Sequence, residues 1–560
     1  MVPPIIDVDT SPQRSAWDLF VFRKSRELLP TRRLLDELRA EIQTGTDSSL
    51  IDALVRGGEI ETGLADEASP AAEAMTHVVD QLAVMACRTS SMARSSVVAM
   101  LENIAAYPSQ IRCAHPEGFS YYGLHPLDFA DLAGKIHPRL RPRVAVIGIR
   151  SVGSTLGAVV VAALRAQGGI ARRITIRPAG EPYERRATFS PIQLQWIRSE
   201  LGKHANFAVV DEGPGFSGST FLSVARALLA AGVPRSRIVL LCSRPLPAHL
   251  QGSELAREWR SFESYRIEYG RRLPAGARQS LGGGAWRNLL LAGRAHWPAC
   301  WTDQERIKHL SADGKTFLKF EGFGRYGHRA RQQAEALAQA GFSPPLNTLD
   351  CGYAGYDLIP GRPLCQRDLT PAVLERMAAY CAFRASSFPA GHADSTVLND
   401  MLRVNLKIEF DIQDFKLAIP VERPVFPDCR MLPHEWLLGG GEVLKTDAVS
   451  HGEGHQLPGP TDIAWDLAGT IIEWQLPAAA ASYFLRSYCR QSGDDPTARM
   501  AHYLLLYRVL RMAQCRMASA AMDNNIDALL FNRFYLYLRS LLKVSLNMQS
   551  LASPSPLRLQ

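Results

Sequence analysis

Cysteine pairs of the CxxC type are absent from this sequence, whose ten cysteines are widely and irregularly spaced. Such spacing excludes a zinc ribbon and a disulfide framework, and it fits a reduced, cytoplasmic environment. The segment SHGEGH places His451, Glu453 and His455 close together, but the sequence offers no evident fourth ligand. A plain polar loop is therefore the expected interpretation of that segment.

Long apolar runs and long blocks of like charge are also missing. No run approaches the ~20 residues that span a bilayer, and the first residues lack the basic and apolar regions of a secretory signal. A net charge of +8 over 560 residues is modest; it permits anionic ligands and gives no reason to expect nucleic acid or a membrane as a partner. We expect a cytoplasmic protein of about three domains that acts on small molecules.

The most informative segment is FAVVDEGPGFSGST, residues 207 to 220. An apolar strand ends in two adjacent carboxylates, Asp211 and Glu212, and a Gly/Pro-broken loop then leads to a helix that begins at Phe221. Small residues at a helix N-terminus direct backbone N–H groups and hydroxyls at one point, which suits a phosphate. The acid pair suits sugar hydroxyls or a metal bound to them. Together these groups predict a site for a ribose 5-phosphate.

A second loop of the same kind lies upstream. The strand Arg143 to Ile149 is followed by RSVGST, residues 150 to 155, and by a helix from Leu156 to Gln167. Two more strands are expected, at Ala171 to Arg177 and at Arg237 to Leu241. Strands that alternate with helices predict a parallel α/β sheet, with both loops at the ligand-binding edge.

This order of strand, acid pair and small-residue loop resembles the type I phosphoribosyltransferases. The resemblance implies a PRPP-dependent phosphoribosyltransferase, a glycosyltransferase of pentosyl groups that makes a nucleotide-like small molecule from an acceptor that the sequence does not identify. Asp211 and Glu212 would be the catalytic pair and would hold Mg²⁺ through PRPP. The residues implied for the 5-phosphate are Ser217, Gly218, Ser219 and Thr220. Those implied for the pyrophosphate are Arg150, Ser151, Gly153, Ser154, Arg185 and Arg186, with Gly153 allowing close approach of the backbone.

One alternative stays open at this point. A regulatory protein could keep the same loops as a PRPP sensor and bind nucleic acid or a protein partner without turnover. Two complete loops favour turnover, and the sequence contains no recognisable DNA-binding module. A homodimer is compatible with either interpretation.

The C-terminal part has a different pattern. A hairpin is expected from Glu305 to Phe320 around the turn SADG, followed by a helix from His328 to Gln339. This region resembles the aminoglycoside phosphotransferase and choline kinase branch of the kinase-like fold. The resemblance implies that Lys319 and Glu335 form the ion pair that orients ATP phosphates. It also implies that Asp447 binds a metal and that Asp466 supports the catalytic loop.

The catalytic loop departs from the family pattern HGDxxxxN. The segment PDCRMLPHEWLL, residues 427 to 438, puts Arg430 at the position of the catalytic base and Glu435 at that of the asparagine. Since phosphoryl transfer needs a positioning carboxylate and metal ligands, we expect a degenerate kinase-like domain that still binds ATP, with Asp428 or His434 as the candidates to replace the lost carboxylate.

The predicted fold class is α/β, with a parallel-sheet phosphoribosyltransferase-type domain between an N-terminal helical segment and a C-terminal α+β kinase-like domain. The predicted boundaries are 1–105 for the helical region, 106–250 for the parallel-sheet domain, 251–300 for a connector, 301–547 for the kinase-like domain and 548–560 for a disordered tail.

Overall fold

The structure is a computed structural model of the 560-residue chain, and its described residues fall into eleven segments. They are 16–19, 26–44, 46–88, 93–180, 184–215, 217–247, 250–268, 271–291, 297–449, 457–522 and 525–551. His451, Glu453 and His455 lie outside them. The chain forms two compact units, one of residues 24–286 with 304–359 and the other of residues 1–23, 287–303 and 360–560. Each unit is described by itself.

The first of these units begins with a helical region. Its elements are β1 (Arg26–Pro30), α1 (Thr31–Thr44), α2 (Asp47–Asp66), α3 (Ala71–Ala86), α4 (Arg94–Glu102), β2 (Gln110–Ala114), α5 (Glu117–Ser120) and α6 (Asp128–Ile136). β1 and β2 pair antiparallel. Thr46 caps α2 with a capping box, because its hydroxyl accepts the Ser49 N–H and the Ser49 hydroxyl accepts the Thr46 N–H. This helix is buried along most of its length.

A parallel five-stranded sheet follows in the same unit. Its strands are β3 (Arg143–Ile149), β4 (Ile170–Ile176), β5 (Asn206–Val210), β6 (Ile238–Cys242) and β7 (Glu263–Arg266), in the order β4-β3-β5-β6-β7. The helices between them are α7 (Val152–Ala166), α8 (Pro191–Gly202), α9 (Ser219–Ala230) and α10 (Glu254–Arg260). The four strands predicted for this part of the sequence are therefore confirmed.

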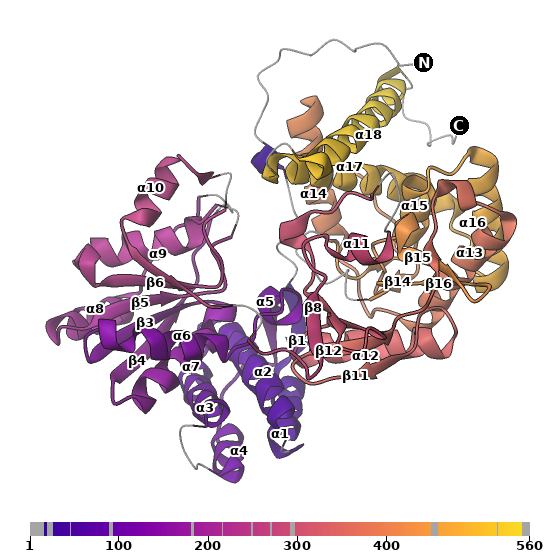
Figure 1. Cartoon of the computed structure of the whole chain (residues 1–560). Helices are drawn as coiled ribbons and strands as arrows, with labels where there is room; N and C mark the ends of the chain where they lie inside the picture. The colour runs from indigo at the N-terminus through magenta and orange to yellow at the C-terminus, as the bar shows by residue number, and fades with distance from the viewer. Residues whose placement is uncertain are drawn as a thin grey trace. The chain divides into compact units, whose positions relative to one another are not determined.

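Both faces of the parallel sheet are buried. Side chains alternate between the faces of a strand, so Val144 and Val146 of β3 pack into one core cluster with α7 and the N-terminal helices, whereas Ile147 and Ile149 pack into a second cluster with α8 and α9. Figure 1 shows α9 and α7 on opposite sides of this sheet. Helices on both faces explain why these strands are continuous apolar runs.

The unit is completed by an antiparallel sheet and one long helix. The strands are β8 (Ala277–Ser280), β9 (Lys308–Ser311), β10 (Thr316–Phe320), β11 (Leu346–Thr348) and β12 (Tyr353–Asp357), in the order β11-β12-β10-β9-β8. The predicted hairpin is present as β9 and β10. Helix α12 (Gly324–Gln339) follows β10 and contacts α2. Phe320 and Phe323 belong to the same core cluster as the N-terminal helices.

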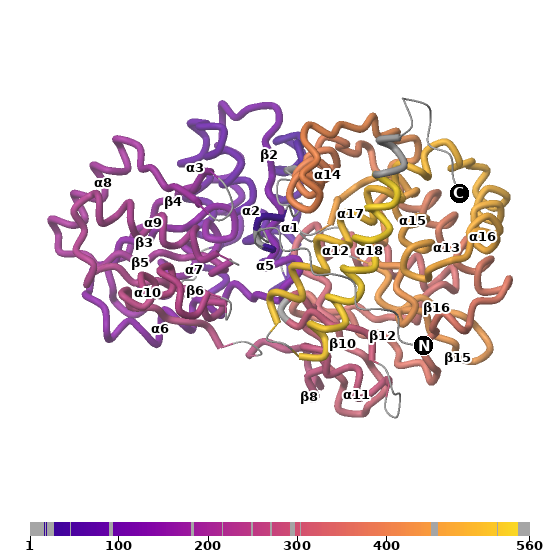
Figure 2. The backbone as a smooth tube through the Cα atoms, turned by 90° about the horizontal axis from the view of Figure 1, so that it is seen from above, coloured from indigo at the N-terminus to yellow at the C-terminus, as the bar shows by residue number. Residues whose placement is uncertain are grey.

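The other unit is mostly helical. Its helices are α11 (Trp286–Leu290), α13 (Pro371–Ser387), α14 (Ser395–Phe410), α15 (Ala464–Glu473), α16 (Ala478–Ser492), α17 (Thr497–Ala521) and α18 (Ile526–Leu551). The first residue of α11, Trp286, belongs to the unit described first. Its short strands are β13 (Arg362–Pro363), β15 (Trp436–Gly439) and β16 (Glu442–Lys445) in one sheet, and β14 (Pro424–Val425) with β17 (Thr461–Asp462) in another. α13 lies beside α16, and α17 beside α18 (Figure 2).

The structure thus has the predicted mixture of a parallel sheet, antiparallel sheets and many helices. The compact units group residues differently from the predicted domains, because the β9–β10 hairpin and α12 belong with the N-terminal helices and the parallel sheet. α18 extends past residue 547 into the predicted tail, and residues 552–560 lie outside the described ones. Among the helices of the described residues, none is both long and apolar enough to cross a bilayer.

Candidate functional site

The segment between β14 and β15 corresponds to the predicted catalytic loop. It is held by Asp466 in the first turn of α15, whose carboxylate accepts the backbone N–H groups of Asp428 at 2.8 Å and Cys429 at 2.9 Å. Asp466 is fully buried, and burial raises its pKa to about 6 against the opposing effect of Arg384. Asp466 therefore lies where the sequence predicted a residue that supports the loop.

An ion pair joins the two unusual residues of this loop. Arg430 Nη2 lies 2.9 Å from Glu435 Oε1, with Glu435 buried and Arg430 partly exposed. The charge of Arg430 therefore neutralises that of Glu435, the two residues at which the sequence departs from the expected catalytic-loop pattern.

A second cation, Lys445 at the end of β16, lies beneath the loop. Its ammonium group is 3.1 Å from Glu435 and 3.4 Å from Asp428, and it donates to the carbonyl oxygens of Thr446 at 3.0 Å and Asp447 at 2.9 Å. Lys445 is fully buried. Sequence reasoning missed this residue, although a lysine that ends the strand EVLK two residues before Asp447 was the available signal.

Asp428 does not have the surroundings of a catalytic base. It is fully buried, it accepts a short hydrogen bond from the Tyr380 hydroxyl, and it faces Lys445. A base must reach the proton that it removes, and the Asp428 carboxylate is directed instead at Tyr380 and Lys445 inside the protein. Asp447 follows β16 with φ +52°, a left-handed conformation that is uncommon outside glycine and recurs at functional positions.

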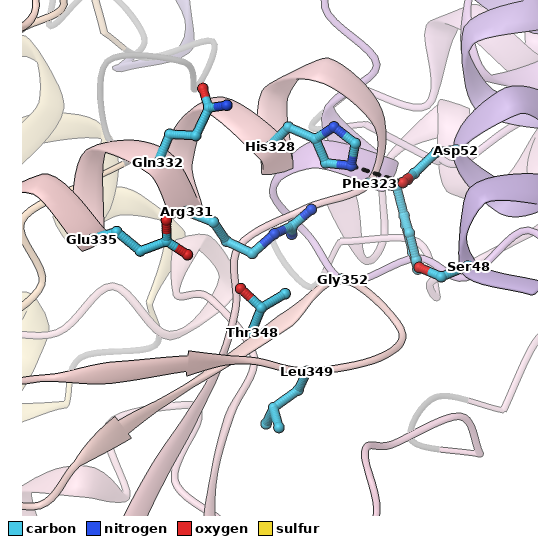
Figure 3. Close-up of a pocket in the computed structure, with 10 residues that line it drawn as sticks. All are labelled: Ser48, Asp52, Phe323, His328, Arg331, Gln332, Glu335, Thr348, Leu349 and Gly352. Carbon is cyan, nitrogen blue, oxygen red and sulfur yellow. Dashed lines mark hydrogen bonds and ion pairs between the residues drawn. The ribbon is translucent and has the colours of Figure 1, made fainter. Parts of the chain in front are cut away.

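In the other unit, Lys319 of β10 is buried in a cluster of charged groups. Its ammonium group lies 3.2 Å from Glu321, which also accepts a hydrogen bond from the Tyr356 hydroxyl at 2.6 Å and lies 3.4 Å from Arg306. One carboxylate partner of Lys319 therefore lies directly after its own strand. Glu335, the partner that the sequence predicted, is exposed on α12 and lines a pocket there (Figure 3).

The predicted acid pair lies at the carboxyl end of β5. Asp211 Oδ1 accepts the Glu212 N–H at 2.8 Å, and Glu212 Oε2 accepts the Gly118 N–H of α5 at 2.8 Å. Burial raises the pKa of Asp211 to about 7 and that of Glu212 to about 8, where Glu117 also contributes. The pKa values of both carboxyl groups therefore lie close to neutral pH.

The small-residue loop after the acid pair is largely packed into the protein. Ser217 and Ser219 are buried, and their hydroxyls are hydrogen-bonded to each other at 2.8 Å. Gly218 has φ +64° and precedes α9. The carbonyl oxygen of Thr220 accepts a hydrogen bond from the Ser223 hydroxyl at 2.8 Å.

The loop after β3 is also engaged in internal contacts. Arg150 pairs with Asp66 at 3.0 Å, and the Ser154 hydroxyl lies 2.9 Å from the hydroxyl of Thr62, which also donates to the Ser151 carbonyl. A Cβ on Gly153 would lie 2.5 Å from the Val210 carbonyl oxygen.

Arg185 and Arg186, which were expected to bind the pyrophosphate together with this loop, make other contacts in the structure. Arg185 donates to the Gly180 carbonyl at 2.5 Å, and Arg186 is exposed, with its backbone bridged to Ala179. Among the residues that the structure describes, no three His, Cys, Asp or Glu side chains gather as a metal site.

No family model and no curated protein matches the sequence. Solved structures do show a likeness. A choline/ethanolamine kinase family protein from Mesorhizobium loti is 16% identical, with a TM-score of 0.32 over 45% of this chain and 90% of that one. The choline kinase LicA from Streptococcus pneumoniae is 13% identical, with a TM-score of 0.27 over 42% and 89%. An ethanolamine kinase from Plasmodium vivax is 8% identical, with a TM-score of 0.28 over 42% and 79%.

These comparisons fit a kinase-like part of the chain and correct the functional prediction made from residues 143 to 220. The proteins found are choline and ethanolamine kinases, so a PRPP-dependent phosphoribosyltransferase is not supported, and neither is the PRPP-sensing alternative. The physical reason lies in the internal contacts of the predicted loops, in which Ser154, Ser217 and Ser219 are buried and Arg150 pairs with Asp66. A strand, a small-residue loop and a helix recur in many α/β sheets, and a fold motif does not fix a function. At TM-scores of 0.27 to 0.32, functional conclusions depend on the residues of this chain.

Proposed function

We propose that the kinase-like part of this chain is a nucleotide-binding module that does not transfer phosphoryl groups by the usual carboxylate- and metal-assisted route. The observation that most strongly supports this proposal is the 2.9 Å ion pair between Arg430 and Glu435. Protein kinases require a carboxylate that accepts or orients the acceptor hydroxyl, and an asparagine and an aspartate that hold Mg²⁺. Here two of these three positions bear Arg430 and Glu435.

The charged groups around the catalytic-loop segment also argue against phosphoryl transfer. Asp428 and Glu435 contribute two negative charges, and Arg430 and Lys445 contribute two positive ones, all within contacts of 2.9 to 3.4 Å. A divalent cation would have to displace the buried ammonium group of Lys445 or the partly exposed guanidinium group of Arg430 to reach these carboxylates. Breaking such buried pairs costs about 3–5 kcal/mol, so the loop disfavours a metal ion.

Nucleotide binding is proposed for the residues that the family pattern retains. Lys319 keeps a carboxylate partner in Glu321, as the phosphate-binding lysine of a kinase does. Lysine carries its charge to a phosphate as a compact point charge. ATP is the nucleotide that we expect from the sequence of the C-terminal region.

Thermal unfolding with and without ATP tests the proposal. A ligand that binds only the native state stabilises it by about 2.7 kcal/mol at a hundredfold excess over Kd. We expect ATP to raise the melting temperature of the wild type and not that of Lys319→Met. Lys315→Met is the matched control, because Lys315 is exposed in the turn of the same hairpin. If ATP leaves the wild type unchanged, or shifts Lys319→Met equally, nucleotide binding through Lys319 is refuted.

A further inference from the structure

A polar pocket lies between α2 and α12. Its volume is about 270 Å³. α2 contributes Ser48 and Asp52, and the turn between β11 and β12 contributes Thr348 and Gly352. The remaining lining comes mainly from one face of α12, as Figure 3 shows: His328, Arg331, Gln332 and Glu335.

Arg331 is the central feature of this pocket. Its side chain is 91% buried, since only 9% is exposed, and its guanidinium group points into the space between α2 and the β11–β12 turn (Figure 3). One guanidinium nitrogen, Nη1, donates to the Gly322 carbonyl oxygen at 3.0 Å. No carboxylate oxygen of the described residues lies within 4.0 Å of the guanidinium group.

A buried guanidinium without an ion-pair partner is energetically costly. Burial lowers the pKa of Arg331, and the more distant negative charges of Asp52, Glu321 and Glu335 do not offset that effect. The remaining N–H donors of Arg331 match the geometry of a carboxylate or a phosphate, which a guanidinium binds through two parallel hydrogen bonds. A small anion would therefore fit the remaining donors of Arg331.

The other polar groups that line the pocket favour a carboxylate over a phosphate. Asp52 is already bound by the Gly324 N–H at 2.6 Å and by His328 Nε2 at 3.0 Å, whereas Glu335 is exposed at the rim. Both acids repel a doubly charged phosphate more than a singly charged carboxylate. Glu335 would in turn attract an ammonium group on the same ligand. The hydroxyls of Ser48 and Thr348 are additional donors.

We infer that this pocket binds a small metabolite with the chemistry of a free amino acid, its carboxylate on Arg331 and its ammonium group toward Glu335. The ligand would join α2 to α12, the helix that follows the strand of Lys319. The inference does not rest on Lys319, and its test uses neither ATP nor a Lys319 variant, so its outcome is separate from that of the nucleotide-binding proposal.

Isothermal titration of the full chain with each of the twenty L-amino acids tests the inference, with acetate, methylamine and inorganic phosphate as further probes. We expect at least one amino acid to bind more tightly than acetate or methylamine. Arg331→Gln should weaken its binding about tenfold or more, because a charged hydrogen-bonded partner is lost. Thr348→Val, at an exposed strand end, should weaken it a few-fold without disturbing the fold.

Arg329→Gln is the matched control, because Arg329 lies on the same helix but does not line the pocket. Its affinity for the amino acid should equal that of the wild type. Three outcomes would overturn the inference. They are that no amino acid binds, that Arg331→Gln and Thr348→Val both bind the amino acid as tightly as the wild type does, or that phosphate alone binds through Arg331. If Arg331→Gln fails to fold, loss of affinity in Thr348→Val and in Glu335→Gln supports the site, and unchanged affinity in both refutes it.

Discussion

Replacing Lys445 with methionine tests whether the catalytic loop is held by internal charge. Methionine keeps most of the length of the side chain and removes the ammonium group. That group contacts Glu435 at 3.1 Å, Asp428 at 3.4 Å and two backbone carbonyl oxygens. Asp428 is fully buried, so it would be left as a poorly compensated charge. Loss of one member of a buried pair costs about 3–5 kcal/mol, and we expect a destabilisation of that size.

Urea unfolding is the appropriate assay, followed by hydrogen exchange of peptides that cover β15 and β16. These peptides report the stability around the loop, whereas a whole-chain midpoint averages over both units. Lys445→Met combined with Glu435→Gln should recover about 1–3 kcal/mol relative to additivity, because contacting residues couple. A destabilisation below about 1 kcal/mol, or strict additivity in the double variant, would refute the proposed charge network.

The remaining predictions concern the parallel-sheet region. Asp211→Asn should stabilise β5 and α9 relative to the wild type, and this stabilisation should be about 2 kcal/mol larger at pH 8.5 than at pH 5.5. The reason is that an acid whose folded pKa is raised to about 7 destabilises the native state as pH rises from about 4 to 7. Hydrogen exchange at the two pH values checks this, with exposed Glu184→Gln as control, and equal effects at both pH values would contradict it. Gly153→Ala should lower the stability of the same sheet by about 1–3 kcal/mol, because its Cβ would lie 2.5 Å from the Val210 carbonyl oxygen; a variant that melts like the wild type would show that the backbone relaxes there.

The sequence predicted most of the strands because their signal is local. The run RVAVIGI and the acid-terminated strand before Asp211 are apolar throughout, as strands with helices on both faces are. The hairpin of β9 and β10 was predicted from its SADG turn in the same way. Such patterns depend on neighbours in sequence, and they hold without knowledge of the tertiary structure.

The function of the loops was not predictable by the same means. Arg150 was expected to bind a pyrophosphate, but its partner is Asp66, 84 residues earlier in the chain. Gly153 was expected to admit a ligand, but it packs against the Val210 carbonyl. A ligand-binding and a packing role require the same small or polar residues, and only long-range contacts distinguish them. The same limit applies to Arg331, whose pocket is completed by Ser48 and Asp52 of a distant segment.

The central claim is that this kinase-like part does not transfer phosphoryl groups by the usual route. The most direct measurement is ADP formation by the purified chain at saturating ATP and Mg²⁺, with Asp447→Asn as the matched variant. We expect no ADP formation that depends on Asp447, because Arg430 stands at the position of the catalytic carboxylate and is paired with Glu435. ADP formation over many turnovers that is lost in Asp447→Asn would contradict this account and show that another group performs the role of the missing carboxylate.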